Sequence, residues 1–170
     1  MLFFIRYKME FGLELTLFFG ADSLEQEAAG YLACLEKAGA GGLKLTEAQA
    51  LELAQTHRQA LAQAGRVALG PGAVEKLLEI FEDSPYLEEE NCLYILEELT
   101  TLFCRYKSDT WDQLSDEMLL ACMKTAFDGC CHGSLELLES RALLRLARQV
   151  REKGSSAAES FLAEAAAWKD

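Results

Sequence analysis

The chain has 170 residues, of which 51% are hydrophobic and 26% are charged, a composition typical of one globular domain with a substantial core rather than of a disordered chain. Its formal net charge is −12, which opposes binding to nucleic-acid phosphates and to anionic membrane surfaces. We therefore expect neither a nucleic acid nor a membrane among its partners.

The N-terminal 20 residues are rich in apolar side chains, but Arg6, Lys8 and Glu10 interrupt them. No run reaches the ~18 apolar residues that a membrane-spanning helix needs. There is also no basic region followed by an uninterrupted apolar core and a cleavage site, so no secretory signal is expected. Met9 lies just before a better-patterned segment, so we expect either Met1 or Met9 to be the natural start.

The strand signal is weak and falls in two places. Leu13, Leu15, Leu17 and Phe19 alternate with Gly12, Glu14, Thr16 and Phe18, and a period of two is typical of a strand. The short segment RVALG at 66–70 could pair with them. A small two-stranded β element from 13–19 and 66–70 is therefore an optional part of the prediction.

Helical patterns cover most of the remaining chain. Apolar residues recur at helical spacing after residues that favour helix starts. The starting residues are Asp22, Thr46, Pro71, Pro85, Ser115, Ser134 and Ser156. The sequence thus predicts a mainly α protein, an irregular bundle of about seven helices.

The flexible segment AGAGG at 38–42 is the best candidate for a domain boundary. It separates an N-terminal segment, residues 1–42, with one helix from a helical core domain, residues 43–170. The N-terminal segment is expected either to pack on the core or to be loosely tied to it.

The six cysteines follow no regular framework and include no CxxC pair. Such scattered cysteines in helical patterns predict reduced, mostly buried thiols and a cytoplasmic protein. Cys130, Cys131 and His132 form the tip of a tight turn between two helices. A soft-metal or redox site there would need further ligands, since zinc takes four, so a plain turn is favoured.

His57 falls on the apolar side of its predicted helix, with Arg58 at the edge. A buried imidazole and a buried guanidinium both need hydrogen-bonding partners, and Glu75 and Glu79 of the following helix are available. Because no nucleophile and orienting acid accompany His57 in the sequence, these two residues are interpreted as a structural polar core rather than as a catalytic base.

Charge is segregated along the chain. Residues 79–98 hold eight acidic residues and no basic one, whereas residues 134–153 carry a net charge of +2. The second segment has an apolar stripe for the core and a second face that mixes leucine with arginine. That Leu/Arg face consists of Leu137, Arg141, Leu144, Arg145 and Arg148. It is either covered by the acidic helix of the same chain or docks a protein partner, which includes a second copy.

Five short segments carry a resemblance to a known family. They are LT at 45–46, GRV at 65–67, DSPY at 83–86, SDE at 115–117 and FDGCCHGSLELL at 127–138. Over residues 43–145 the chain resembles a bacterial family of small, uncharacterised proteins, which continues after GRV with an acidic residue and a phenylalanine where this chain has Ala68 and Leu69. The resemblance implies a bacterial cytoplasmic setting and no assigned activity.

The function predicted from the sequence is non-catalytic: a helical protein–protein interaction or adaptor protein, with self-association through the Leu/Arg face as one form of it. The alternative is a metal- or redox-responsive protein that uses the turn at Cys130, Cys131 and His132. An enzyme acting on a small molecule stays open but would need a pocket that the sequence does not reveal, and no cofactor is predicted.

Overall fold

The computed structural model describes residues 21–39 and 42–167, and within them it is a bundle of seven helical rods without a strand. The rods are α2 (Ala21–Lys37), α3 (Glu47–Gln63), α4 (Ala73–Phe81), α5 (Cys92–Asp109), α6 (Asp116–Asp128), a continuous rod of α7 (Leu135–Leu137), η1 (Leu138–Leu143) and α8 (Leu144–Lys153), and α9 (Ala157–Ala167). The prediction of a mainly α, irregular bundle is confirmed.

The optional β element is not confirmed. Residues 66–70 form an irregular connection between α3 and α4, and residues 13–19 lie outside the described part of the chain. A side-chain contact fixes this connection: Arg66 forms an ion pair with Asp112 at 2.8 Å. The next side chain, Val67, is 98% exposed. The side-chain contact of Arg66 with Asp112 thus fixes a connection where the sequence pattern suggests a strand.

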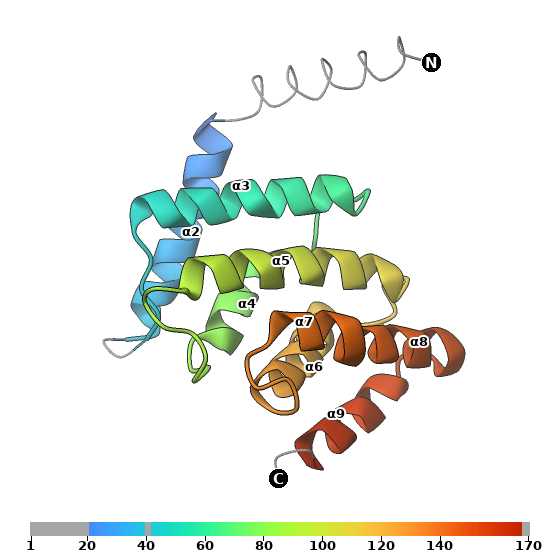
Figure 1. Cartoon of the computed structure of the whole chain (residues 1–170). Helices are drawn as coiled ribbons and strands as arrows, with labels where there is room; N and C mark the ends of the chain where they lie inside the picture. Colours follow the sequence, from blue (N-terminus) through green and yellow to red (C-terminus); the bar gives the residue numbers. More distant parts are fainter. Residues whose placement is uncertain (1–20, 40–41, 168–170) are drawn as a thin grey trace, which may run out of the picture.

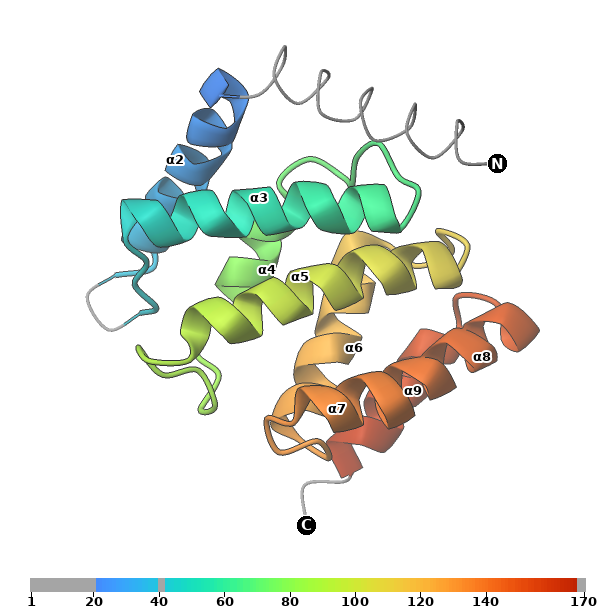
Figure 2. The same ribbon diagram turned by 45° about the horizontal axis from the view of Figure 1, so that its top comes forward.

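The helices α3 and α5 lie side by side, with α3 above α5 in Figures 1 and 2. Behind them in Figure 1, α2 crosses α3 steeply and α4 lies next to α5. The rod from α7 to α8 and helix α9 form the opposite end, and α6 joins the two ends. The arrangement brings α2, α3 and α4 together around one space although the loop residues 38–46 and 64–72 separate them in sequence.

Three predicted helix starts are confirmed by side-chain caps. Thr46 and Gln49 form a reciprocal capping box on α3, Ser115 accepts from the backbone N–H of Met118, and Ser134 caps the rod that begins at α7. These hydroxyls satisfy N–H groups that the first turn of a helix leaves without a partner.

Two predicted starts differ from the structure, one by two residues and the other by seven. Helix α4 begins after Gly72, which has a left-handed backbone (φ 67°), and not at Pro71. Helix α5 begins at Cys92 rather than Pro85, because the Asn91 side chain accepts from the N–H of Glu88 and donates to the carbonyl of Tyr86. These bonds stabilise a turn where the sequence pattern predicted helix.

A single core cluster unites the elements on both sides of the predicted boundary. Tyr31 and Leu35 of α2 pack in the same cluster as Leu53 of α3, Phe103 of α5 and Phe161 of α9. Of the described residues of the N-terminal segment, those of α2 thus contribute directly to the core. Among the described residues, none of the helices combines the length and apolar character needed to cross a membrane.

Candidate functional site

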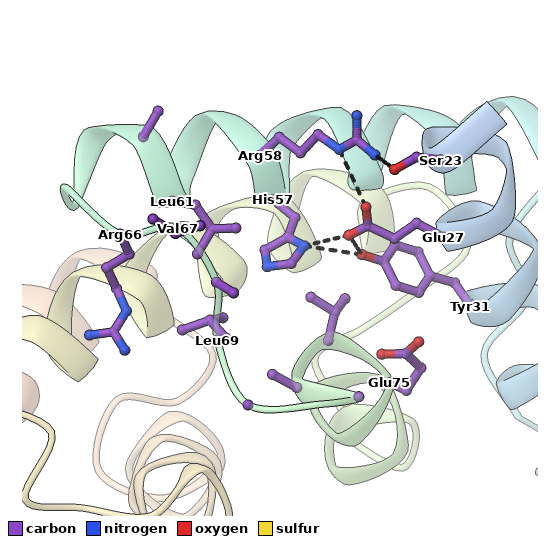
Figure 3. Close-up of a pocket in the computed structure, with 16 residues that line it drawn as sticks. Ser23, Glu27, Tyr31, His57, Arg58, Leu61, Arg66, Val67, Leu69 and Glu75 are labelled. Carbon is purple, nitrogen blue, oxygen red and sulfur yellow. Dashed lines mark hydrogen bonds and ion pairs between the residues drawn. The ribbon is translucent and has the colours of Figure 1, made fainter. Parts of the chain in front are cut away.

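A large cavity opens between α2, α3, the N-terminus of α4 and the connection 66–70, and has a volume of about 550 Å³. This size falls in the range of small-molecule sites, roughly 300–1,000 Å³. Much of its wall is apolar, and a few polar side chains converge on it (Figure 3). The residues that carry its chemistry are Ser23, Glu27, Tyr31, His57, Arg58, Arg66 and Glu75.

The centre of this pocket is a hydrogen-bonded group of three side chains. Glu27 Oε1 accepts from the Tyr31 hydroxyl at 2.6 Å and lies 2.5 Å from His57 Nδ1. The Tyr31 oxygen is 3.5 Å from the same ring nitrogen. Since a carboxylate can only accept, the Nδ1 of His57 carries a proton and donates a hydrogen bond to Glu27.

Charges around Glu27 keep it ionised. Burial raises the pKa of this carboxyl, but the hydrogen bonds from His57 and Tyr31, together with the positive charge of Arg58, outweigh it, and the net pKa is below the ordinary value. Burial and the neighbouring Glu27 raise the pKa of Tyr31 far above its usual range. Glu27 is thus a fixed acceptor and Tyr31 a fixed donor at neutral pH.

The second nitrogen of the His57 ring has no partner among the described residues. Nε2 is buried and makes no hydrogen bond, and in Figure 3 it lies on the side of the ring away from Glu27. An imidazole whose one proton is on Nδ1 presents a lone pair at Nε2. A carboxylate that orients a histidine in this way also prepares it to accept a proton.

A second polar atom of the pocket wall is also unmatched. Arg66 binds Asp112 through both terminal nitrogens, at 2.8 and 3.0 Å, while its Nε is buried and has no partner within the described residues. The hydrogen bonds to Asp112 raise the pKa of Arg66, so its Nε–H remains a donor. The residues that line the pocket thus include an acceptor, His57 Nε2, and a donor, Arg66 Nε–H, that have no partner within the described residues.

The structure brings the two predicted residues of the polar core together with partners that the sequence did not single out. His57 and Arg58 both bind Glu27 of α2, with Arg58 Nε 3.5 Å from the carboxylate and a further bond from Arg58 to Ser23. For His57, Glu27 thus takes the place of the expected partners Glu75 and Glu79. Glu75 lines the pocket, and Glu79 accepts from the Cys34 thiol. The spacing of Glu27 and Tyr31, four residues apart on one helix, was the available signal.

The Leu/Arg face is only partly covered by its own chain. Leu144 is 50% exposed, and Leu137 is half-buried against the core. Arg145 forms an ion pair with Glu164 of α9. Arg141 and Arg148 are exposed and form no ion pair within the described residues. Within the described residues, no ion pair joins Arg141 or Arg148 to a carboxylate of residues 79–98.

The turn at Cys130 and Cys131 lies next to that face. The two sulfurs are 3.7 Å apart, Cys131 is buried and Cys130 half-buried, and both are free thiols. His132 is exposed with a left-handed backbone (φ 48°). Within the described residues no three His, Cys, Asp or Glu side chains converge on a position that could hold a metal ion.

Comparison with known proteins gives one match. Residues 31–156 match a family described as a family of unknown function, DUF6323. The matched range includes α3, α4 and the C-terminal part of α2. No curated protein and no solved structure matches the chain.

Proposed function

The chain belongs to DUF6323, a family of unknown function, and this membership assigns no activity. We therefore propose a function from the geometry of the pocket. The protein binds a small organic ligand between α2, α3 and α4, and His57 Nε2 accepts a hydrogen bond from it. The observation that carries this proposal is the buried Nε2 without a partner, beside a cavity of about 550 Å³. A buried polar atom without a partner costs about 1–3 kcal/mol, which a bound donor would recover.

The charges of the wall select the ligand. Glu27 is balanced by Arg58, and the terminal nitrogens of Arg66 are occupied by Asp112. Glu75 adds a further carboxylate to the lining, and the chain as a whole is strongly acidic. The favoured ligand is therefore a neutral or cationic molecule with an N–H or O–H group for His57, and carboxylate ligands are disfavoured.

The apolar part of the wall selects the hydrocarbon part of the ligand. Leu61, Val67, Leu69 and Val74 line the same cavity, and they would pack against a hydrocarbon body. An alkyl or aryl amine, alcohol or primary amide combines this body with a donor. The Nε–H of Arg66 suits a ligand that carries an acceptor at its other end.

The test is a comparison of amines, alcohols and primary amides with carboxylates of the same carbon skeleton. We expect the donor ligands to raise the melting temperature and to titrate to one site by calorimetry, whereas the carboxylates do neither. His57→Phe keeps a planar aromatic side chain and removes both nitrogens, so binding should be lost.

His132→Asn is the matched control, because His57 and His132 are the two histidines of the chain and His132 is exposed outside the pocket. It should bind as the wild type does. Equal affinity of the amines for wild type and His57→Phe, with helicity retained in both, would contradict the proposal.

A second candidate function is self-association through the Leu/Arg face, in a protein that we place in the cytoplasm. It is favoured by the exposure of Leu144 and by Arg141 and Arg148, which lack an ion pair in the described part of the chain. A complementary surface exists on the same molecule: Glu88, Glu89 and Glu90 are exposed, and Tyr94 nearby is 62% exposed. The two surfaces differ, so the contact would be head-to-tail.

For this candidate, we expect the wild type to sediment as a concentration-dependent oligomer that high salt dissociates, because exposed charge pairs are screened. Arg141→Glu with Arg148→Glu should make it monomeric without a change in helicity. The control Lys37→Glu with Lys44→Glu makes the same change in net charge at two exposed lysines elsewhere. A monomeric wild type, or equal loss in both double variants, would count against self-association.

A further inference from the structure

The turn that carries Cys130 and Cys131 is fixed by its own backbone. The N–H of Cys131 donates to the carbonyl of Ala126 at 2.9 Å, and that of Gly133 donates to the carbonyl of Phe127 at 2.8 Å. Gly133 has a left-handed backbone, and a Cβ at this position would overlap the Tyr86 ring. The backbone that carries both thiols is therefore fixed, and the Cys130 thiol lies 3.6 Å from the carbonyl oxygen of Ala126.

The thiols share a second, smaller cavity of about 250 Å³ with the Leu/Arg face. Its lining residues are Cys130, Cys131, Leu137, Arg141, Ala142 and Arg145. Part of this wall comes from the π-helical segment η1, which interrupts the rod between α7 and α8. Such π-bulges occur frequently at functional sites.

The chemistry of this cavity disfavours a metal cation. Burial, with smaller effects from Cys130, raises the pKa of the Cys131 thiol to about 12, so this sulfur is protonated at neutral pH. Zinc requires thiolates and usually four ligands, and the guanidinium groups of Arg141 and Arg145 would repel a cation. A fitting ligand is neutral, takes two sulfurs and accepts their protons.

We propose that Cys130 and Cys131 chelate a neutral trivalent arsenical in this cavity. Arsenous acid, As(OH)₃, forms one As–S bond with each cysteine, and each S–H proton leaves with one hydroxyl as water. Two waters are released, the third hydroxyl stays on arsenic, and arsenic remains trivalent, so neither an oxidant nor a reductant is needed. The Arg141 guanidinium can donate a hydrogen bond to that hydroxyl.

The sulfur separation supports chelation over disulfide formation. Two sulfurs 3.7 Å apart, each bound at about 2.3 Å as in zinc–thiolate sites, meet one centre at a nearly tetrahedral angle. A disulfide would instead bring the sulfurs to about 2.05 Å, and the fixed turn opposes that movement. The second As–S bond is intramolecular, which makes the chelate roughly 10²–10⁴-fold tighter than a single bond.

The experiment uses the reduced full-length chain with sodium arsenite. We expect a one-to-one adduct in native mass spectrometry and protection of two thiols from a thiol-reactive dye. Cys130→Ser and Cys131→Ser should each lose this adduct, with affinity lower by roughly 10²-fold or more. Cys92→Ser, which removes another buried thiol, should keep it.

Circular dichroism of each variant distinguishes loss of the site from loss of the fold. An adduct that persists in a folded Cys130→Ser or Cys131→Ser protein would overturn the proposal. So would the absence of an adduct in the folded wild type, or Zn²⁺ that protects the same thiols more tightly than arsenite does.

Discussion

At the scale of single residues, the decisive feature is the direction in which one imidazole is held. Glu27 accepts from both Tyr31 and His57 Nδ1, which leaves the buried Nε2 as the open position. The sequence indicates that His57 faces the inside of the bundle. It does not reveal Glu27 as the partner, because that contact depends on the angle at which α2 crosses α3.

Glu27 links this arrangement to stability. Its pKa in the folded chain is below the ordinary value of 4.5, so its ionised form stabilises the fold above that pH, and the stabilisation is lost as the pH falls through the lowered pKa. Glu27→Gln should lower the free energy of unfolding at pH 7 by about 1–2 kcal/mol.

The difference between wild type and Glu27→Gln should shrink below pH 4.5, the ordinary pKa of this carboxyl, when urea unfolding is measured over a pH series. Glu25→Gln, an exposed site on the same helix, should differ little from wild type at any pH. A difference for Glu27→Gln that stays constant down to the acid transition would contradict the assigned role of the carboxylate.

At the scale of elements, the sequence is most informative where a side chain caps a helix. Thr46, Ser115 and Ser134 were predicted to start helices and do so. The failures are at 66–70 and 85–91, where contacts distant in sequence decide the backbone: Arg66 reaches Asp112, and the turn at Tyr86 packs against Gly133. Periodicity within a segment contains no information on such contacts.

Gly65 and Gly133 both have a left-handed backbone, but only at Gly133 would an added Cβ overlap another side chain. Alanine substitutions at these two positions therefore compare the stability cost of the backbone conformation alone with the cost of the same conformation plus a steric overlap. At Gly65 (φ 67°) nothing lies within 4 Å of the position that a Cβ would take, whereas at Gly133 (φ 77°) the Tyr86 ring occupies that position. Gly65→Ala should cost about 1 kcal/mol of stability. Gly133→Ala should cost about 1–3 kcal/mol more.

Urea unfolding of the two alanine variants measures this difference directly. Gly133→Ala with Tyr86→Ala should recover part of the added loss, because the substitution of Tyr86 removes the overlapping ring. Equal losses for Gly65→Ala and Gly133→Ala would mean that the turn at Cys130 and Cys131 is not held against Tyr86 as described.

At the scale of the whole molecule, the pocket forms only when several helices of the chain pack together. Its walls come from α2, α3, α4 and the connection 66–70, four segments whose apolar patterns each predict only that one face is buried. The number and class of the helices could be predicted because each depends on local periodicity. The cavity could not, since it depends on how three helices cross and on the short connection that leaves a space between them.

The most direct measurement of the central claim is the ¹⁵N NMR spectrum of the histidine rings, with His132→Asn used to assign them. The account predicts that His57 is protonated at Nδ1 and bare at Nε2 in the ligand-free protein at neutral pH, and that an amine or amide ligand shifts Nε2 of His57 alone. A proton on Nε2 with a bare Nδ1, or a Nε2 signal that no bound ligand moves, would contradict it.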